Sequence, residues 1–246
     1  MRALLVTSRV TFVPRNYDSF VLALADSPQV CGLLVLDNRQ GTRLRALAAW
    51  AMGARGIGRQ LLVNGFGWRA GECSRRRAFT SRGKSFHVQR SINERTAVAL
   101  LRELDLDVVV NARTREIYGG EALSAPRLGC LNVHHGLLPA QRGLMCDLWA
   151  LYTNEPAGFS IHAMTRRVDD GEILRAVAVS HGERDYLAHL AASAAREAGE
   201  LAQLLDQIGR TGVVEGRPNR RTAATVYRRN PTWSQIRQMR AAGLRL

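Results

Sequence analysis

Residues 132–143 read Asn-Val-His-His-Gly-Leu-Leu-Pro-Ala-Gln-Arg-Gly and carry the clearest structural signal in this 246-residue chain. They overlap the end of a short apolar run, and we predict a buried strand over 129–133. Asn132 and His134 lie two residues apart, so at the end of a strand their side chains share one face. Open parallel sheets place their sites at the carboxyl ends of strands. The stretch therefore predicts a cleft with both side chains in it.

Strand and helix patterns alternate on both sides of this stretch. This alternation is typical of an α/β domain whose mostly parallel sheet is flanked by helices. Residues 56–90 are less regular, with two glycines around Phe66, and we interpret them as a connecting segment that holds one helix at most. The other predicted strands are 2–7, 30–36, 107–111, 158–164 and 173–179, and the predicted helices are 18–25, 43–54, 93–104, 144–152 and 185–208.

Asp169 follows the predicted strand 158–164 in a loop that can return to the same cleft. An amide, an imidazole and a carboxylate so placed suit acyl transfer. Asn132 can donate an N–H to a developing oxyanion, His134 can exchange a proton, and Asp169 can orient the imidazole and favour its charged form. No serine or cysteine nearby has the setting of an activated nucleophile. The residues therefore favour direct attack by a substrate amine over a covalent enzyme intermediate.

Asn-x-His, then Leu-Leu-Pro, a basic residue and glycine, and later an aspartate–glycine turn together resemble the formyltransferase family. That family includes methionyl-tRNA formyltransferase, glycinamide ribonucleotide formyltransferase and sugar N-formyltransferases. The resemblance covers about residues 105–180, and Asn132, His134 and Asp169 match the family's catalytic positions. It implies a Rossmann-like formyltransferase fold and 10-formyltetrahydrofolate as the formyl donor.

The resemblance also implies where the folate would bind. A loop after the strand 107–111 would border the pteridine ring, and the loop around Asp169 would cover its other side. His135 and Arg142 are candidates for contact with the acceptor. The expected folate-binding residues are Arg113, Thr114, Arg115, Ile117, Asp170 and Gly171.

Two departures from the family bear on the acceptor, and a third bears on the site. The residues after the first strand, Thr-Ser-Arg-Val-Thr-Phe at 7–12, lack the glycine- and asparagine-rich phosphate loop of the purine enzyme. About 38 residues after 208 cannot supply the β domain of the tRNA enzyme. Gly136 stands where relatives often carry serine, which bears on the surroundings of His134.

The tail differs in composition from the rest of the chain. From Gly209 it is polar and basic, and we predict a catalytic domain over 1–208 and a C-terminal extension over 209–246 that packs on the domain or on a partner subunit. A short strand is expected near 224–227 and a helix over 231–242, with Trp233, Ile236 and Met239 as its contact face.

The composition limits the classes of partner. The net charge of +14 suits an anionic acceptor or, less well, nucleic acid; the basic residues are spread rather than gathered in one stripe. The four cysteines form no C-x-x-C pair, so we expect free thiols in a reducing cytoplasm and no metal site. No apolar run approaches a membrane span, and no membrane partner is expected.

These observations lead to one functional hypothesis with open alternatives. We expect a cytoplasmic enzyme that transfers formyl from 10-formyltetrahydrofolate to the amine of a small acceptor, either an amino sugar nucleotide or a natural-product precursor. The alternatives are methionyl-tRNA formylation, hydrolysis of the formyl-folate, a non-catalytic folate-binding module, and an RNA-binding protein. A homo-oligomer is compatible with each.

Overall fold

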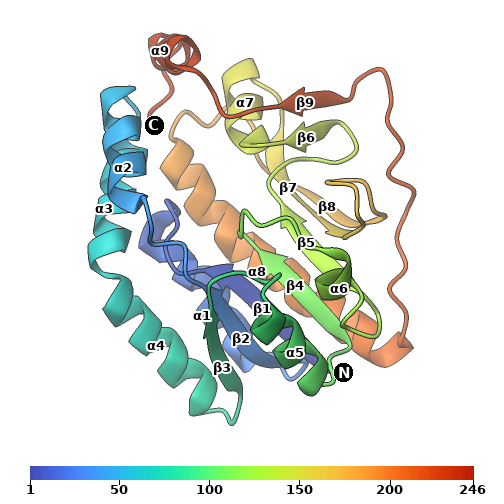
Figure 1. The fold of residues 1–246 in the computed structure, drawn as a ribbon. Helices are drawn as coiled ribbons and strands as arrows, with labels where there is room; N and C mark the ends of the chain where they lie inside the picture. Colours follow the sequence, from blue (N-terminus) through green and yellow to red (C-terminus); the bar gives the residue numbers. More distant parts are fainter.

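A seven-stranded sheet forms the centre of the computed structural model, which describes residues 1–246 (Figure 1). The strand order is β3-β2-β1-β4-β5-β7-β8. The first five strands in this order are parallel, and β7 and β8 are antiparallel to their neighbours. Six strands confirm the sequence-based predictions, with ends that differ by at most one residue. The strands are β1 (Ala3–Ser8), β2 (Val30–Leu36), β3 (Ser85–Gln89), β4 (Val108–Ala112), β5 (Cys130–His134), β7 (Ala157–Ala163) and β8 (Ile173–Ser180).

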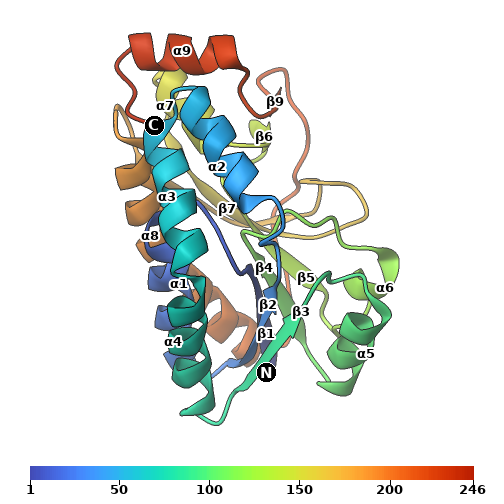
Figure 2. The ribbon, with the colours of Figure 1, turned by 60° about the vertical axis from the view of Figure 1, so that its left-hand side comes forward.

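Helices cover both faces of this sheet (Figure 2). Alternate residues of β1 point to opposite faces, so Leu5 joins the larger apolar core and Leu4 the smaller one. The larger core packs against α1 (Asp18–Ala23) and the long α8 (Tyr186–Thr211), with the 3-10 turns Pro14–Tyr17 and Leu24–Asp26 beside α1. The smaller core lies under α5 (Arg95–Glu103) and α6 (Gly120–Leu123). Both faces of the parallel strands are therefore buried, as their continuous apolar runs require.

The interpretation of residues 56–90 as a connecting segment is wrong. After α2 (Thr42–Ala51) the chain forms α3 (Arg55–Phe66), α4 (Trp68–Thr80) and strand β3. Helices α2 and α3 make a hairpin in which Gly58 lies against α2; a Cβ at this position would be 2.9 Å from the Ala46 carbonyl oxygen. Gly58 therefore permits close contact between the two helices.

The residues after α8 return across the molecule. Strand β9 (Val226–Arg228) pairs with β6 (Gln141–Gly143), which leads into α7 (Cys146–Thr153). The last helix, α9 (Trp233–Ala241), begins at a capping box between Thr232 and Gln235. Ile236 and Met239 are buried, as expected of the contact face. Trp233 is 55% exposed, so its inclusion in that face is wrong.

Two further findings concern the chain as a whole. All four cysteines are free, as the sequence predicts, and burial raises the pKa of Cys130 to about 12. None of the helices combines the length and the apolar character that crossing a bilayer requires.

Candidate active site

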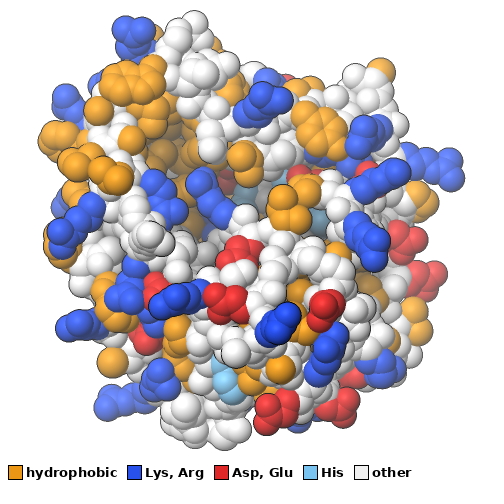
Figure 3. Space-filling model, viewed as in Figure 1, with side chains coloured by type: hydrophobic (Ala, Val, Ile, Leu, Met, Phe, Trp, Pro, Cys, Tyr) orange, Lys and Arg blue, Asp and Glu red, His pale blue; other side chains and the backbone are white.

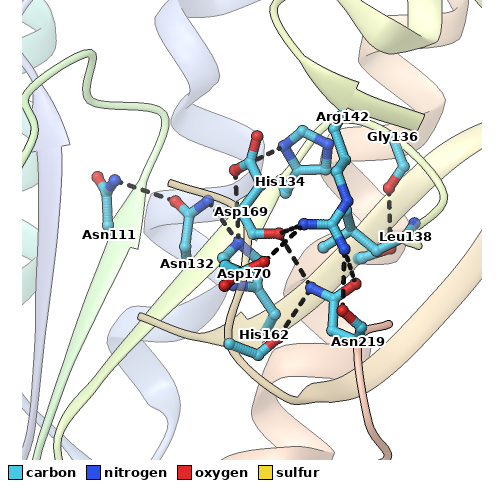
Figure 4. A network of polar contacts seen from close by, with 12 residues as sticks. Asn111, Asn132, His134, Gly136, Leu138, Arg142, His162, Asp169, Asp170 and Asn219 are labelled. Atoms are coloured by element: carbon cyan, nitrogen blue, oxygen red, sulfur yellow. Dashed lines mark hydrogen bonds and ion pairs between the residues drawn. The ribbon is translucent and has the colours of Figure 1, made fainter. Parts of the chain in front are cut away.

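Three polar side chains lie in one row across the centre of the sheet. Asn132 on β5 is opposite Asn111 on β4 and opposite His162 on β7. Asn111 Nδ2 donates to Asn132 Oδ1 at 3.0 Å, and Asn132 Nδ2 lies 3.0 Å from His162 Nε2 (Figure 4). The change from parallel to antiparallel pairing at β5 thus brings residues from three distant segments together.

Hydrogen bonding fixes the direction of this row. His162 Nδ1 lies 2.8 Å from the Ala163 carbonyl, which can only accept, so Nδ1 carries the hydrogen and Nε2 accepts from Asn132. Burial and the neighbouring His134 lower the pKa of His162 to about 4, which keeps the ring neutral near pH 7. The Asn132 amide is therefore held in one orientation, with its second N–H left for a ligand.

His134 is held at both ring nitrogens. Its Nε2 lies 2.8 Å from the Gln141 carbonyl oxygen, and its Nδ1 lies 3.4 Å from Asp169 Oδ1. The Gln141 carbonyl can only accept, so Nε2 carries the hydrogen of the neutral ring. Nδ1 carries a hydrogen, and can donate it to Asp169, only when the ring is protonated. Gly136 packs closely against these groups in this chain, since a Cβ there would be 2.9 Å from both His134 Nε2 and the Gln141 oxygen. Nδ1 is thus the nitrogen available for proton exchange.

The backbone at Asp169 is in the left-handed region, with φ of 54°. Gly143 N–H donates to Asp169 Oδ2 at 3.0 Å. Behind the loop, Arg142 Nη1 donates to the Asp169 carbonyl at 2.5 Å, and Asn219 Nδ2 donates to the same carbonyl at 3.0 Å. A residue of the C-terminal tail therefore helps to fix the carboxylate that faces His134.

Arg142 does not have the position expected for an acceptor contact. Its side chain is fully buried, and its guanidinium also donates to Asp170 Oδ1 at 3.2 Å and Asn219 Oδ1 at 2.7 Å. A charged group this deeply buried must have its hydrogen bonds satisfied by the protein. We correct the expectation accordingly: Arg142 braces the loop at 169–171 from behind.

A cavity of about 860 Å³ opens in front of these groups, and Figure 3 shows the hollow from outside. Asn132, His134 and Asp169 all line it, as does His162. Nearly half of its lining residues are apolar. A pocket that combines apolar surface with a few convergent polar groups is typical of a small-molecule site.

The residues expected to contact folate divide into two groups. Arg113, Thr114, Arg115 and Ile117 line the cavity, whereas Asp170 and Gly171 do not. Thr114 donates through its N–H and hydroxyl to Asn111 Oδ1, at 3.2 and 2.6 Å, which ties this loop to the row of polar side chains. Ile117 is 69% exposed at the rim. Gly171 packs against the Ala163 carbonyl and contributes to the shape of the loop that carries Asp169.

A second buried polar cluster lies beneath the cavity. Glu197 of α8 is fully buried; its Oε1 lies 3.3 Å from Arg113 and 3.2 Å from His135 Nδ1, and Tyr17 donates to its Oε2. Burial would raise the pKa of Glu197, but His135 and Arg113 outweigh burial and lower it. Burial and Arg113 lower the pKa of His135. His135 therefore lines the cavity while its ring is held by α8.

Sequence reasoning undervalued three members of the site. His162 lies on a strand that the sequence predicts, and its alternation with Ser160 and Met164 puts these side chains on one face. Asn111 ends a predicted strand in the same way as Asn132 does. Asn219 lies in a segment without periodicity, and no local pattern indicates its contact with Asp169.

Comparisons with known proteins concern the family and the fold of the chain. A family model described as Formyl transferase matches residues 73–202, more than half of the chain. A methionyl-tRNA formyltransferase of Thermotoga maritima is 39% identical over 84 residues, which are 34% of this chain and 27% of that protein. The chain thus matches little more than a quarter of that relative's length.

Two solved structures share the fold. A 4-N formyltransferase from Francisella tularensis superposes with a TM-score of 0.57 at 14% identity, over 92% of this chain and 75% of its own. Glycinamide ribonucleotide transformylase 1 from Symbiobacterium toebii superposes with a TM-score of 0.56 at 23% identity, over 88% of this chain and 92% of its own. At these identities the likeness concerns the fold.

Proposed function

Because the chain belongs to the formyl transferase family, we propose that it transfers a formyl group from 10-formyltetrahydrofolate to the amine of a small acceptor. The observation that carries this proposal is the meeting of Asn132, His134 and Asp169 at one wall of a ligand-sized cavity. An N–H donor, an ionisable imidazole and an orienting carboxylate are the groups that formyl transfer to an amine requires.

The residues fit a folate at the loops named above. Backbone groups around Thr114, with Ile117 and Tyr118 on one side and Val168 on the other, offer polar edges and apolar surfaces to a flat ring. Bound there, the folate supplies the activated formyl carbon. The division of the chain into a domain over 1–208 and an extension over 209–246 remains part of the proposal, since α8 itself continues to Thr211.

In the proposed reaction the neutral acceptor amine forms a bond to the formyl carbon, and the bond from that carbon to the folate nitrogen breaks. The free N–H of Asn132 donates to the formyl oxygen as negative charge develops on it, and the positive charge of protonated His134 stabilises that oxygen. Asp169 Oδ1, 3.4 Å from Nδ1, orients the ring. The His134 Nδ1 proton then moves to the departing folate nitrogen, and the proton lost by the attacking amine restores it.

Two arginines support an anionic acceptor. Arg45 of α2 and Arg115 line the cavity, and neither forms an ion pair with a carboxylate. Burial and the neighbouring Arg45 lower the pKa of Arg115. Two cations without a counter-charge favour a ligand that brings one, such as a nucleotide-linked amino sugar or an acidic natural-product precursor.

The test is incubation with 10-formyltetrahydrofolate and a panel of amines, with mass spectrometry of the products. A formylated nucleotide sugar or precursor amine supports the proposal. Formyl-methionyl-tRNA, free formate without an amine product, or folate binding without turnover would each replace it with one of the alternatives. His134→Ala is the matched control for the chemistry.

A further inference from the structure

The outer surface of the α2–α3 hairpin exposes large apolar side chains. Leu44, Leu47 and Trp50 recur every third residue on α2, on the side away from its buried residues, and Val63 and Phe66 recur likewise on α3. Leu44 and Phe66 are 73% and 71% exposed. We call these five residues the hairpin face. Figure 3 shows apolar side chains gathered over these helices, a concentration that marks an interaction site.

Arginines surround the hairpin face almost without acidic residues. Residues 42–66, which form α2 and α3, contain four arginines and no acidic residue. Arg45 lines the cavity, and the other three lie outside it. The guanidinium of Arg43 lies 5.6 Å from the Phe66 ring, and that of Arg55 lies 5.7 Å from the Trp50 ring. Both arginines, with Arg59, are exposed and form no ion pair. The surface therefore combines apolar contact area with uncompensated positive charge.

We propose that the hairpin face docks on an anionic lipid surface. Helices that lie in a membrane interface carry Trp, Phe and Leu on one side and arginines beside them. A second copy of the chain would place Arg43, Arg55 and Arg59 opposite the same three arginines, which disfavours a symmetric dimer through this face. Nucleic acid would pair with the arginines but would leave the aliphatic Leu44 and Leu47 in water. This docking departs from the sequence-based expectation of no membrane partner.

Docking would also orient the active site. The opposite side of α2 lines the cavity through Ala48, Ala49 and Met52. The hairpin that contacts the lipid surface would then hold the cavity about one helix diameter from it, roughly 10 Å. An acceptor amine carried at headgroup level could reach the site, a consequence that rests on the proposed function.

The test is co-sedimentation of the full chain with vesicles of phosphatidylcholine, with and without phosphatidylglycerol, at low and high salt. We expect binding only to the mixed vesicles, weakened by salt. Replacing Arg43, Arg55 and Arg59 together with Gln should weaken binding about 100-fold, at about 1 kcal/mol for each arginine near the surface. Leu44→Ser with Leu47→Ser should also weaken it. Controls are the same Gln changes at three exposed arginines elsewhere, Arg90, Arg210 and Arg220.

Several outcomes would overturn the docking proposal. These are no binding to mixed vesicles, equal losses in the control variant, binding of tRNA instead of vesicles through the same arginines, or a dimer that the Leu44→Ser, Leu47→Ser variant abolishes in light scattering. The two proposals fail separately. The variants leave the groups at the reacting centre intact, so formyl transfer to a soluble amine should persist in them whether or not the face docks.

Discussion

Replacing Asn219 with Ala should loosen the loop that carries Asp169. The Asn219 amide donates to the carbonyls of Asp169 and Gly171, at 3.0 and 2.9 Å, and its oxygen accepts from the Arg142 guanidinium at 2.7 Å. Two neutral hydrogen bonds contribute about 1 kcal/mol each, and one to a charged group contributes about 1.5–3 kcal/mol. Water can replace part of this at a half-buried side chain, so we expect a loss of about 3 kcal/mol of unfolding free energy.

Urea unfolding measures this loss, and turnover measured on the same samples shows whether the site follows. Turnover should fall more than folate affinity, because the loop at 113–117 on the other side of the proposed folate site makes no contact with Asn219. Thr222→Ala is the matched control, an exposed residue of the same segment whose hydroxyl makes no hydrogen bond. If Asn219→Ala unfolded within about 0.5 kcal/mol of the unchanged chain and kept its turnover, the bracing of Asp169 by the tail would be refuted.

Three further predictions concern the site. Asn132→Ala, His134→Ala and Asp169→Ala should each reduce turnover about 100- to 1000-fold, with folate binding retained in calorimetry; a double variant much worse than the worst single one would argue against a concerted set. Gly136→Ala should cost roughly 100-fold in turnover by displacing His134, and wild-type kinetics would contradict that packing. With the pKa of His162 lowered to about 4, the unfolded chain binds a proton there between about pH 6.5 and 4 that the folded chain does not, so unfolding free energy falls as pH drops through this window. His162→Gln should reduce that fall by about 3 kcal/mol in urea titrations, and an identical pH profile would exclude this role.

The central sheet was accessible to sequence reasoning for a physical reason. Parallel strands are buried on both faces, so runs such as 30–36 and 107–111 are apolar throughout and stand out from their surroundings. Asn132 and His134 were equally visible, because polar side chains at the end of such a run need a function or a partner. Both the strands and the grouping of polar residues at their ends follow from local pattern.

The α2–α3 hairpin and the bracing of the Asp169 loop were not accessible in this way. Gly58 weakens a helical pattern taken alone, and only the contact with Ala46 of the neighbouring helix explains its place. Arg142 looked like a ligand contact because basic residues beside a motif usually are exposed. Its burial depends on Asn219, which lies far along the chain and could be located only in three dimensions.

The row formed by Asn111, Asn132 and His162 depends on strand register. Side chains alternate between faces, so a slip of one residue in β7 would replace His162 with Ile161 in that row and turn the imidazole to the opposite face. A chain with the slipped register could remain folded but would lose the row of polar side chains. Formyl transfer activity would then show whether β5 and β7 pair in the correct register, which a measurement of stability alone does not reveal. Length changes in the turn at 154–156 should therefore be tolerated over evolution, while a single deletion within 157–162 should abolish activity in a chain that remains folded.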